Sequence, residues 1–548
     1  MFHLLLTAIG SPYPGLADRV DSLPRYGVPP APHFSGFLDA SSAEPGTKLH
    51  YWLAAYTGDG PDWTKRPTVL WLNGGPGASS VMGMLQELGP LIIDSAGALV
   101  DNPYAWTNHA NVIALESPGG VGYSYCAAML KGGACHNTDI STAAAAYAAL
   151  LDFYAKFPFL RNNSFFITGE SYAGVYCPTL AKQIVDGNDR VQPRIPLVGM
   201  AVGDPCTDTP SQRQSMDMLW YAHKNGLVQD KEYNFLVDTC NASAPSERST
   251  GAWLAEQVGT ERTRVVSARP ARPRLGAHAD PEIASSCKAA MRRFLVASSR
   301  GISQSWDHSF INELSFYSPA AEFRFDLPGT LNYHTAAWMM DPKVRAALHV
   351  EAAPAHAWPG PSAGWQYTSN YDACNEAAPP GTPSMVDFYR ELAPKLPGKI
   401  VVYNGDTDPC VSYEGTRDAI AKVGFPEVSP YRPWFFNASA AELALLQRKD
   451  LLFGPSLSLQ AGGSQYGGSI VEYAHGLAFA TVHGSGHMVP TFRPRAALQL
   501  VQHMVANTSF APEVPSDAKI AAMSDAAFDK WLDKWVDSAK GPGYVGRR

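Results

Sequence analysis

One run, Thr168-Gly169-Glu170-Ser171-Tyr172-Ala173-Gly174, constrains the fold of this chain more than any other stretch. It follows an apolar, β-prone stretch at residues 165–167 and leads into a helix-like stretch from 176 to 184. A serine at such a tight strand-turn-helix corner is held out of its turn, and its neighbours must be small because larger side chains would clash. Ala173 stands where the strict pattern has glycine, but alanine is also small. The run therefore predicts a nucleophilic serine beyond the end of a strand.

Short apolar or β-branched runs recur along the chain and end in glycine-rich or acidic loops. Most are separated by helix-like stretches, such as residues 141–157 and 178–185. Strands that alternate with helices predict an α/β fold with a mostly parallel sheet covered on both faces, and sites in such sheets form beyond the carboxyl ends of the strands. The predicted strands are residues 68–72, 112–115, 165–168, 198–202, 400–403 and 477–482.

The bulk composition limits the class of protein. A length of 548 residues is too long for one ordinary domain and suits a large α/β core with an insertion. The hydrophobic fraction of 45% allows a sizeable core. A formal net charge of −7 gives no reason to expect nucleic acid or an acidic membrane surface as a partner. No apolar run reaches the roughly 18 residues that a membrane span needs.

The middle of the chain differs from the rest. Residues 206–331 carry scattered helix-like pieces without a series of strands, so we expect an inserted cap domain. Five arginines among prolines and alanines predict an exposed basic loop, for which proteolytic processing is the functional alternative. They are Arg262, Arg264, Arg269, Arg272 and Arg274. We expect the chain to divide into five segments. Residues 1–16 are a weak or truncated signal segment or a plain disordered N-terminus, residues 17–205 and 332–507 form the two parts of the core, residues 206–331 form the cap with its basic loop near 260–275, and residues 508–548 form the tail. In the tail, an amphipathic helix at residues 521–539 with Trp531 and Trp535 is expected to pack rather than to bind a partner.

Cysteines and glycosylation sequons favour an oxidising compartment. None of the eight cysteines form a C-x-x-C metal pair, so disulfides are the better use for most of them. Together with the sequons they predict a secretory-pathway protein, either vacuolar or lysosomal, or extracellular. The cysteines are Cys126, Cys135, Cys177, Cys206, Cys240, Cys287, Cys374 and Cys410, and the sequons begin at Asn162, Asn241, Asn437 and Asn507.

A serine hydroxyl needs a base, and the base needs an acidic partner. His487 lies on a loop just after the strand at 477–482, while Asp406 and Asp408 both follow the strand at 400–403. The order serine, aspartate, histidine is that of α/β-hydrolases, and these residues alone leave the two aspartates open. The spacing of His483 and His487 could suit a metal pair, but the glycines between them disfavour a helix. We therefore expect no metal and no cofactor.

Two backbone N–H groups must stabilise the negative oxygen that develops during attack. Tyr172, directly after the serine, supplies one. The glycine-rich loop Trp71-Leu72-Asn73-Gly74-Gly75-Pro76-Gly77 follows an early strand and allows the close backbone approach needed for the other. An ordinary tight turn is the alternative interpretation of that loop.

At this point the chain resembles the serine carboxypeptidases, a family that includes a yeast vacuolar carboxypeptidase, lysosomal cathepsin A and plant enzymes. The resemblance extends in order from about residue 18 to 505, and Leu348-His349-Val350 resembles a landmark where the core resumes after the cap. The matching runs are WLNGGPG at 71–77, ELGP at 87–90, ESPGGVGYSY at 116–125, GESYAG at 169–174, NGDTD at 404–408 and GHMVP at 486–490.

The resemblance implies an α/β-hydrolase fold with an inserted cap and a serine-type carboxypeptidase. It assigns Ser171 as nucleophile, His487 as base and Asp408, rather than Asp406, as the acid. It also implies Gly75 and Tyr172 as oxyanion donors. The group that holds the substrate's terminal carboxylate would be Asn73, Glu87 and Glu170, supported by Trp71.

The implied reaction removes single residues from the C-termini of peptides or proteins through an acyl-enzyme. Two glutamates facing a substrate carboxylate cannot all be ionised, so some pKa values must rise. We therefore expect peptide hydrolysis to be favoured at about pH 4 to 6. An acyltransferase of the same fold and a non-catalytic protective or binding protein are the alternatives, and homodimer formation is left open. Glu170 favours the peptidase, because such acyltransferases typically carry aspartate before the serine.

Three positions depart from the family pattern. Ala78 stands where many relatives have a cysteine, so one common disulfide is missing. Gly203-Asp204-Pro205 stands where relatives usually have Gly-Asn-Gly, which puts the start of the cap in doubt. Cys410 is either a reduced thiol near the substrate pocket or half of a disulfide.

Overall fold

The computed structural model places most of the chain. It describes residues 13–59, 62–94, 96–212, 218–241, 280–297, 331–354, 356–374, 381–439, 441 and 463–540. The predicted basic loop near 260–275 and most of the segment 1–16 lie outside the described residues.

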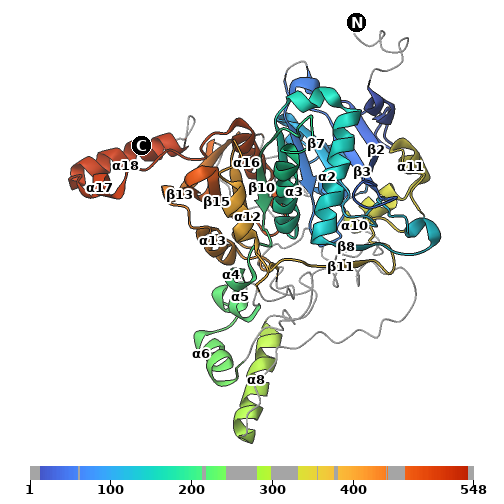
Figure 1. The fold of residues 1–548 in the computed structure, drawn as a ribbon. Helices are drawn as coiled ribbons and strands as arrows, with labels where there is room; N and C mark the ends of the chain where they lie inside the picture. Colours follow the sequence, from blue (N-terminus) through green and yellow to red (C-terminus); the bar gives the residue numbers. More distant parts are fainter. Residues whose placement is uncertain are drawn as a thin grey trace.

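A sheet of eleven strands forms the centre of the molecule (Figure 1). Its six middle strands run parallel to one another, and each coincides with one of the runs predicted as strands. The predicted α/β-hydrolase fold class is therefore confirmed. In spatial order these strands are β7 (Asn111–Leu115), β4 (Thr68–Leu72), β9 (Phe165–Glu170), β10 (Leu197–Gly203), β12 (Ile400–Gly405) and β15 (Leu477–Val482).

Antiparallel strands, which the sequence did not predict, extend the sheet on both sides. Beyond β7 lie β3 (Lys48–Ala54), β2 (His33–Asp39) and β1 (Arg19–Val20). Beyond β15 lie β14 (Gly463–Tyr473) and β13 (Glu427–Ala438). Two small ribbons stand apart, formed by β5 (Leu91–Ile93) with β6 (Leu99–Asp101) and by β8 (His136–Thr138) with β11 (Gln366–Thr368).

Helices cover both faces of the sheet because each central strand is apolar on both sides. In β4, Val69 and Trp71 pack into one core and Leu70 and Leu72 into the other, as the two-residue period of a strand requires. One face packs α1 (Ser80–Gln86), α10 (Leu331–Met339), α11 (Pro342–Ala347) and α16 (Pro494–Ala506). The other packs α2 (Asp139–Lys156), α3 (Ala173–Asn188), α12 (Met385–Leu392) and α13 (Tyr413–Ala421).

Short turns complete the core. They are η1 (Pro14–Asp18), η2 (Trp63–Lys65), η3 (Trp106–Asn108), η4 (Met129–Lys131), η5 (Pro158–Asn162), η8 (Ala474–Gly476) and α15 (Val489–Phe492). Gly15 of η1 packs so closely on the ring of Phe157 that a Cβ there would lie 2.5 Å from it. The packed core thus includes residues that the sequence assigned to the 1–16 segment.

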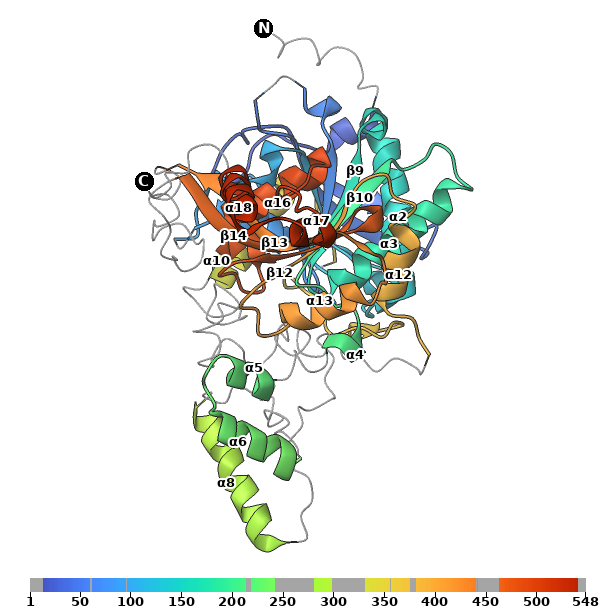
Figure 2. The same ribbon diagram turned by 90° about the vertical axis from the view of Figure 1, so that its left-hand side faces the viewer.

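Helices alone appear in the described parts of the predicted cap. Cys240 and Cys287 form a disulfide within a small separate hydrophobic cluster. The described helices between residues 218 and 297 project from the rest of the molecule (Figure 2). The elements are α4 (Thr209–Gln212), α5 (Met218–Lys224), α6 (Asp230–Asn234), the π-helical turn η6 (Phe235–Thr239) and α8 (Pro281–Ala297). The hydroxyl of Tyr221 on α5 donates a 2.7 Å hydrogen bond to the Thr407 carbonyl of the core.

The tail carries two helices, α17 (Asp517–Ala521) and α18 (Asp525–Lys540). The predicted helix at 521–539 therefore begins four residues late, because α17 ends at Ala521 and a turn intervenes. Trp531 and Trp535 are half-buried, and Trp535 Nε1 donates to the Pro512 carbonyl at 3.3 Å. Among the described helices, none combines the length and apolar character that crossing a bilayer requires.

Candidate active site

Ser171 stands on a strained turn between β9 and α3. Its φ of 62° lies in the left-handed region, which a residue with a side chain adopts only when its surroundings force it. Three backbone hydrogen bonds hold the turn: Ser171 N–H donates to Gly203 O at 2.9 Å, and Ser171 O accepts from Gly174 N–H at 2.8 Å and from Cys206 N–H at 3.0 Å. The serine remains partly exposed while the six residues before it are buried. This is the conformation predicted from the sequence run.

The residues around the serine must be small because neighbouring atoms leave no room for larger side chains. A Cβ on Gly169 would lie 2.4 Å from the Leu72 carbonyl and 2.6 Å from Cβ of Ala173. A Cβ on Gly174 would lie 2.3 Å from the Cys206 carbonyl. Ala173 itself is fully buried at the start of α3, so its methyl group fits where the strict pattern has glycine.

A buried histidine–aspartate pair lies beyond the ends of two neighbouring strands. His487 Nδ1 lies 2.7 Å from Oδ2 of Asp408. The Asp408 carboxylate also accepts hydrogen bonds from the backbone N–H groups of Cys410, at 2.8 Å, and Val411, at 3.2 Å. The two loops are tied together because Thr407 N–H donates to Ser485 O at 3.0 Å. Nδ1 of His487 is thus the protonated nitrogen, which leaves Nε2 as the basic atom.

The second aspartate has a different partner. Asp406 Oδ2 lies 2.8 Å from Nδ1 of His483, and its Oδ1 accepts from Gly484 N–H at 2.7 Å. The His483 side chain is 50% exposed, whereas that of His487 is 5% exposed. The hydrogen bond that His483 donates to Asp406 raises the pKa of His483. The structure therefore shows that Asp408 contacts His487 and Asp406 contacts His483, a pairing that the sequence alone left open.

The glycine-rich loop lies directly against the nucleophile turn. A Cβ on Gly74 would lie 2.4 Å from the backbone nitrogen of Tyr172, so only glycine fits there. Gly75 has a φ of 112°, a conformation that side chains disfavour. The two proposed oxyanion donors, Gly75 and Tyr172, therefore belong to segments in contact.

Asn73 joins the two buried glutamates. Its Nδ2 donates to Glu87 Oε1 at 3.2 Å and to Glu170 Oε1 at 3.0 Å. Its Oδ1 accepts from Trp71 Nε1 at 2.8 Å and from Gly83 N–H at 3.1 Å, which fixes the orientation of the amide. The residues expected to hold a substrate carboxylate thus form one hydrogen-bonded group, with Trp71 in the supporting position.

Because the two glutamates of this group are buried, they keep their protons to a higher pH than exposed glutamates do. Burial raises the pKa of Glu87 to about 7. Burial, followed by the charge of Glu87, raises the pKa of Glu170 well above its usual range. Oε2 of each glutamate is buried and accepts no hydrogen bond from an N–H or hydroxyl donor in the described structure, while the two carboxyls hydrogen-bond to each other. Two such oxygens can accept or share protons when a ligand arrives.

Sequence reasoning missed the side chain that anchors Tyr172. The Tyr172 hydroxyl donates to Asp139 Oδ1 at 2.9 Å, and Tyr367 donates to the same oxygen at 2.7 Å. Asp139 is the first residue of α2 and belongs to none of the matching runs.

Sequence reasoning also missed the position of Asp204. One carboxylate oxygen of Asp204, one of Asp408 and a ring nitrogen of His487 lie within 4.8 Å of one another. Both Asp408 oxygens already accept N–H donors, from Cys410, Val411 and the His487 ring.

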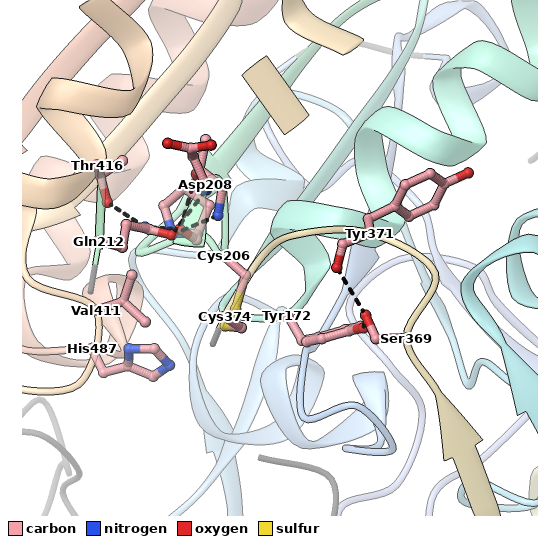
Figure 3. The surroundings of a disulfide bond; sticks show 12 residues. Tyr172, Cys206, Asp208, Gln212, Ser369, Tyr371, Cys374, Val411, Thr416 and His487 are labelled. Atoms are coloured by element: carbon pink, nitrogen blue, oxygen red, sulfur yellow. Dashed lines mark hydrogen bonds between the residues drawn. A yellow bond between two sulfur atoms is a disulfide. The ribbon is translucent and has the colours of Figure 1, made fainter. Parts of the chain in front are cut away.

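Three disulfides account for six cysteines: Cys126–Cys135, Cys206–Cys374 and Cys240–Cys287. Figure 3 shows the Cys206–Cys374 bond with His487 to one side and Tyr172 to the other. Gln212 braces this segment, accepting from Thr207 N–H at 2.8 Å and donating to Pro205 O at 2.8 Å. Cys177 and Cys410 are buried thiols.

A serine on a strand-turn-helix corner, with a histidine–aspartate pair beyond later strands of a parallel-centred sheet, defines the class of α/β-hydrolases. A family model described as serine carboxypeptidase matches residues 24–507. The chain belongs to the serine carboxypeptidase family and is a serine-type carboxypeptidase, which acts on peptides.

Known relatives agree with this assignment. "Serine carboxypeptidase-like 26" of Arabidopsis thaliana is 31% identical over 489 residues, covering 87% of this chain and 89% of the relative. The "lysosomal protective protein" of Mus musculus is 29% identical over 503 residues, covering 88% and 92%. Kex1(delta)p, a prohormone-processing carboxypeptidase from Saccharomyces cerevisiae, has the same fold with a TM-score of 0.57 at 18% identity, covering 90% and 94%.

Proposed function

We propose that this carboxypeptidase releases single C-terminal residues through an acyl-enzyme on Ser171, with His487 as base and Asp408 as its acidic partner. The observation that carries the proposal is the 2.7 Å contact between His487 Nδ1 and Asp408 Oδ2, buried beyond the strands that follow the Ser171 corner. A carboxylate on Nδ1 holds the tautomer in which Nε2 can take the serine proton.

The reaction would proceed in two halves. Ser171 Oγ attacks the last peptide carbonyl while His487 Nε2 removes its proton, and the N–H groups of Gly75 and Tyr172 stabilise the oxyanion. His487 then gives the proton to the leaving nitrogen, the C–N bond breaks, and the terminal amino acid departs. Water, activated by the same histidine, hydrolyses the ester and regenerates Ser171.

Asn73, Glu87 and Glu170 would hold the terminal carboxylate of the peptide. The raised pKa values of the two glutamates support this role, because a protonated carboxyl donates a hydrogen bond to an anion whereas an ionised one repels it. The same property supports a preference for acidic pH, since binding weakens when the glutamates ionise.

The compartment is also a proposal. Three disulfides support passage through an oxidising secretory route. The asparagines of all four sequons, Asn162, Asn241, Asn437 and Asn507, are exposed and therefore open to glycosylation. A vacuolar or lysosomal destination agrees with an acidic optimum. The cap boundaries at 206 and 331 and a homodimer remain predictions.

Release of a free amino acid from an N-blocked dipeptide tests the proposal. We expect release by the purified chain, its loss in Ser171→Ala, and stoichiometric labelling of Ser171 by a serine-directed phosphonate. Acyl transfer to an added alcohol without amino-acid release would instead favour an acyltransferase. Normal folding without either reaction would favour a binding or protective protein.

A further inference from the structure

Asp204 is a buried carboxyl next to the acid of the catalytic triad. It follows β10 directly, as Asp408 follows the neighbouring strand β12, and the parallel pairing of the two strands brings their ends together. Asp204 has 0% and Asp408 1% of its surface exposed. One carboxylate oxygen of each and a ring nitrogen of His487 lie within 4.8 Å of one another, so the two buried carboxyls interact at close range.

Two carboxylates at this distance cannot both be ionised without a compensating cation. The titratable groups that face Asp204 are Asp408, His487, Glu170 on β9 and Tyr403 on β12. Of these, only His487 can carry a positive charge, and Asp408 already holds it. One proton must therefore stay on the Asp204–Asp408 pair while His487 is neutral.

Hydrogen bonds decide which carboxyl keeps the proton. Asp408 accepts three N–H donors spread over both of its oxygens, an arrangement that favours the anion. Asp204 accepts both of its donors on Oδ1, from Asn404 Nδ2 at 3.1 Å and Gly405 N–H at 2.9 Å. Its Oδ2 is buried and accepts no hydrogen bond in the described structure. That pattern is the one expected of a carboxylic acid, with Oδ1 as carbonyl and Oδ2 as hydroxyl.

We propose that Asp204 is a positioning residue of the active site, which stays protonated and donates a hydrogen bond from Oδ2 to Asp408. The proposal rests on the triad proposed above. Asp204 would act through Asp408, holding that carboxylate in line with His487 Nδ1. The same segment also supports the nucleophile, because Gly203 O and Cys206 N–H hold both sides of Ser171. Burial and the charge of Asp408 raise the pKa of Asp204 well above its usual range, in agreement with the geometry.

The sign of the linkage gives a test that does not require activity. Above about pH 4 an aspartate in the unfolded chain loses its proton, whereas folded Asp204 keeps it. The folded state then binds one more proton, so the wild type loses stability as pH rises. Asp204→Asn retains an N–H donor and cannot ionise. The ratio of unfolding constants, wild type over Asp204→Asn, should therefore rise about tenfold per pH unit between pH 4.5 and 7.

Asp208→Asn is the matched control on the same segment. Burial acts to raise the pKa of Asp208, but hydrogen bonds from Ser211 and Ser384 and the ammonium of Lys422 outweigh it, so the pKa is lowered. Asp208 is ionised in both states above about pH 4, and its ratio should be flat over this range. A flat ratio for Asp204→Asn as well would overturn the proposal.

Infrared spectroscopy and kinetics complete the test. The difference spectrum, wild type minus Asp204→Asn at pH 6, should contain a protonated-carboxyl carbonyl band; a carboxylate band in its place would refute the assignment. These readouts apply equally to a chain without peptidase activity, so their failure is distinct from failure of the proposed function.

In the active enzyme, Asp204→Asn should stay within about threefold of the wild type in kcat. Asp204→Ala should lose about 10- to 100-fold in kcat with KM little changed. Equal activity of the Ala and Asn variants would remove the positioning role.

Discussion

The hydroxyl of Tyr172 donates a hydrogen bond of 2.9 Å to Oδ1 of Asp139, which joins the residue after the nucleophile to the first turn of α2. Oδ2 of the same carboxylate accepts from Asn370 N–H at 2.6 Å. Asp139 therefore fixes both Tyr172 and the segment that contains Asn370. The backbone N–H proposed as an oxyanion donor depends on this side-chain contact for its position.

Asp139→Ala should lower the free energy of unfolding by about 2 to 4 kcal/mol, because several buried donors lose their acceptor. It should also lower kcat, since Tyr172 is released. Tyr172→Phe is the comparison: it deletes the hydrogen bond to Asp139 but leaves the other donors to Asp139 in place, so we expect a loss of about 1 kcal/mol and a smaller fall in kcat than in Asp139→Ala. Urea unfolding and kcat measure both. Equal kcat for Asp139→Ala and the wild type would contradict this positioning role.

Asp408→Asn should lower kcat by about 10³- to 10⁴-fold, because an amide favours the wrong tautomer of His487. Asp406→Asn offers a close comparison, since Asp406 pairs with the half-exposed His483. We expect that variant to stay within about threefold of the wild type. Steady-state hydrolysis of a blocked dipeptide distinguishes the two, and a larger effect at Asp406 would reassign the triad.

The carboxylate-binding group predicts a particular pH dependence. Glu87, with a pKa of about 7 in the folded chain, is protonated and able to donate at acidic pH, and it ionises as pH rises through 7. KM for peptides with a free carboxylate should therefore rise above pH 7, while KM for the corresponding peptide amides should not. In Glu87→Gln the rise should flatten, because the amide cannot ionise. The same pH profile for acids and amides would argue against this role.

Stability should follow the same group with the same sign. A glutamate in the unfolded chain ionises at about pH 4.3, whereas Glu87 in the folded chain holds its proton to about 7. Protonated Glu87 gives its full contribution to stability below the pKa of about 4.3 in the unfolded chain. That contribution is lost as the pH rises through the pKa of about 7 in the folded chain. Thermal unfolding of the wild type and Glu87→Gln between pH 4 and 8 measures this: the melting temperature of the variant should fall less steeply with pH.

Removal of the Cys206–Cys374 disulfide should cost about 2 to 5 kcal/mol of folding stability, because it closes a long loop with a sequence separation of 168. The Cys126–Cys135 bond, with a separation of 9, provides the comparison and should cost less. Paired alanine variants and denaturant unfolding measure both. kcat should fall in the first pair only, since Cys206 N–H supports Ser171.

Sequence patterns predicted the parallel centre of the sheet because its strands are buried on both faces and appear as continuous apolar runs. The antiparallel margins give weaker signals. β14 contains Gly463, Gly467 and Gly468, and β13 contains two prolines, so neither resembles an ordinary strand. The Ser171 corner could be predicted because its chemistry and its backbone strain fall within one short run.

Contacts between distant segments could not be predicted in this way. Asp204 was visible as a departure from the family pattern, but its proximity to Asp408 arises from the pairing of β10 with β12, about two hundred residues apart in sequence. Asp139 gave no signal, because an aspartate at the start of a helix is ordinary. Asp406 and Asp408 share one loop, and only the folded turn decides which histidine each faces.

The bond between Cys206 and Cys374 encloses all of the predicted cap at 206–331, including the arginine-rich stretch near 260–275. Ser171 precedes this loop, and Asp408 and His487 follow it. A single backbone cut anywhere inside would therefore yield two polypeptides still covalently joined beside the catalytic groups. Maturation by nicking would leave the nucleophile and its proton acceptor in one molecule.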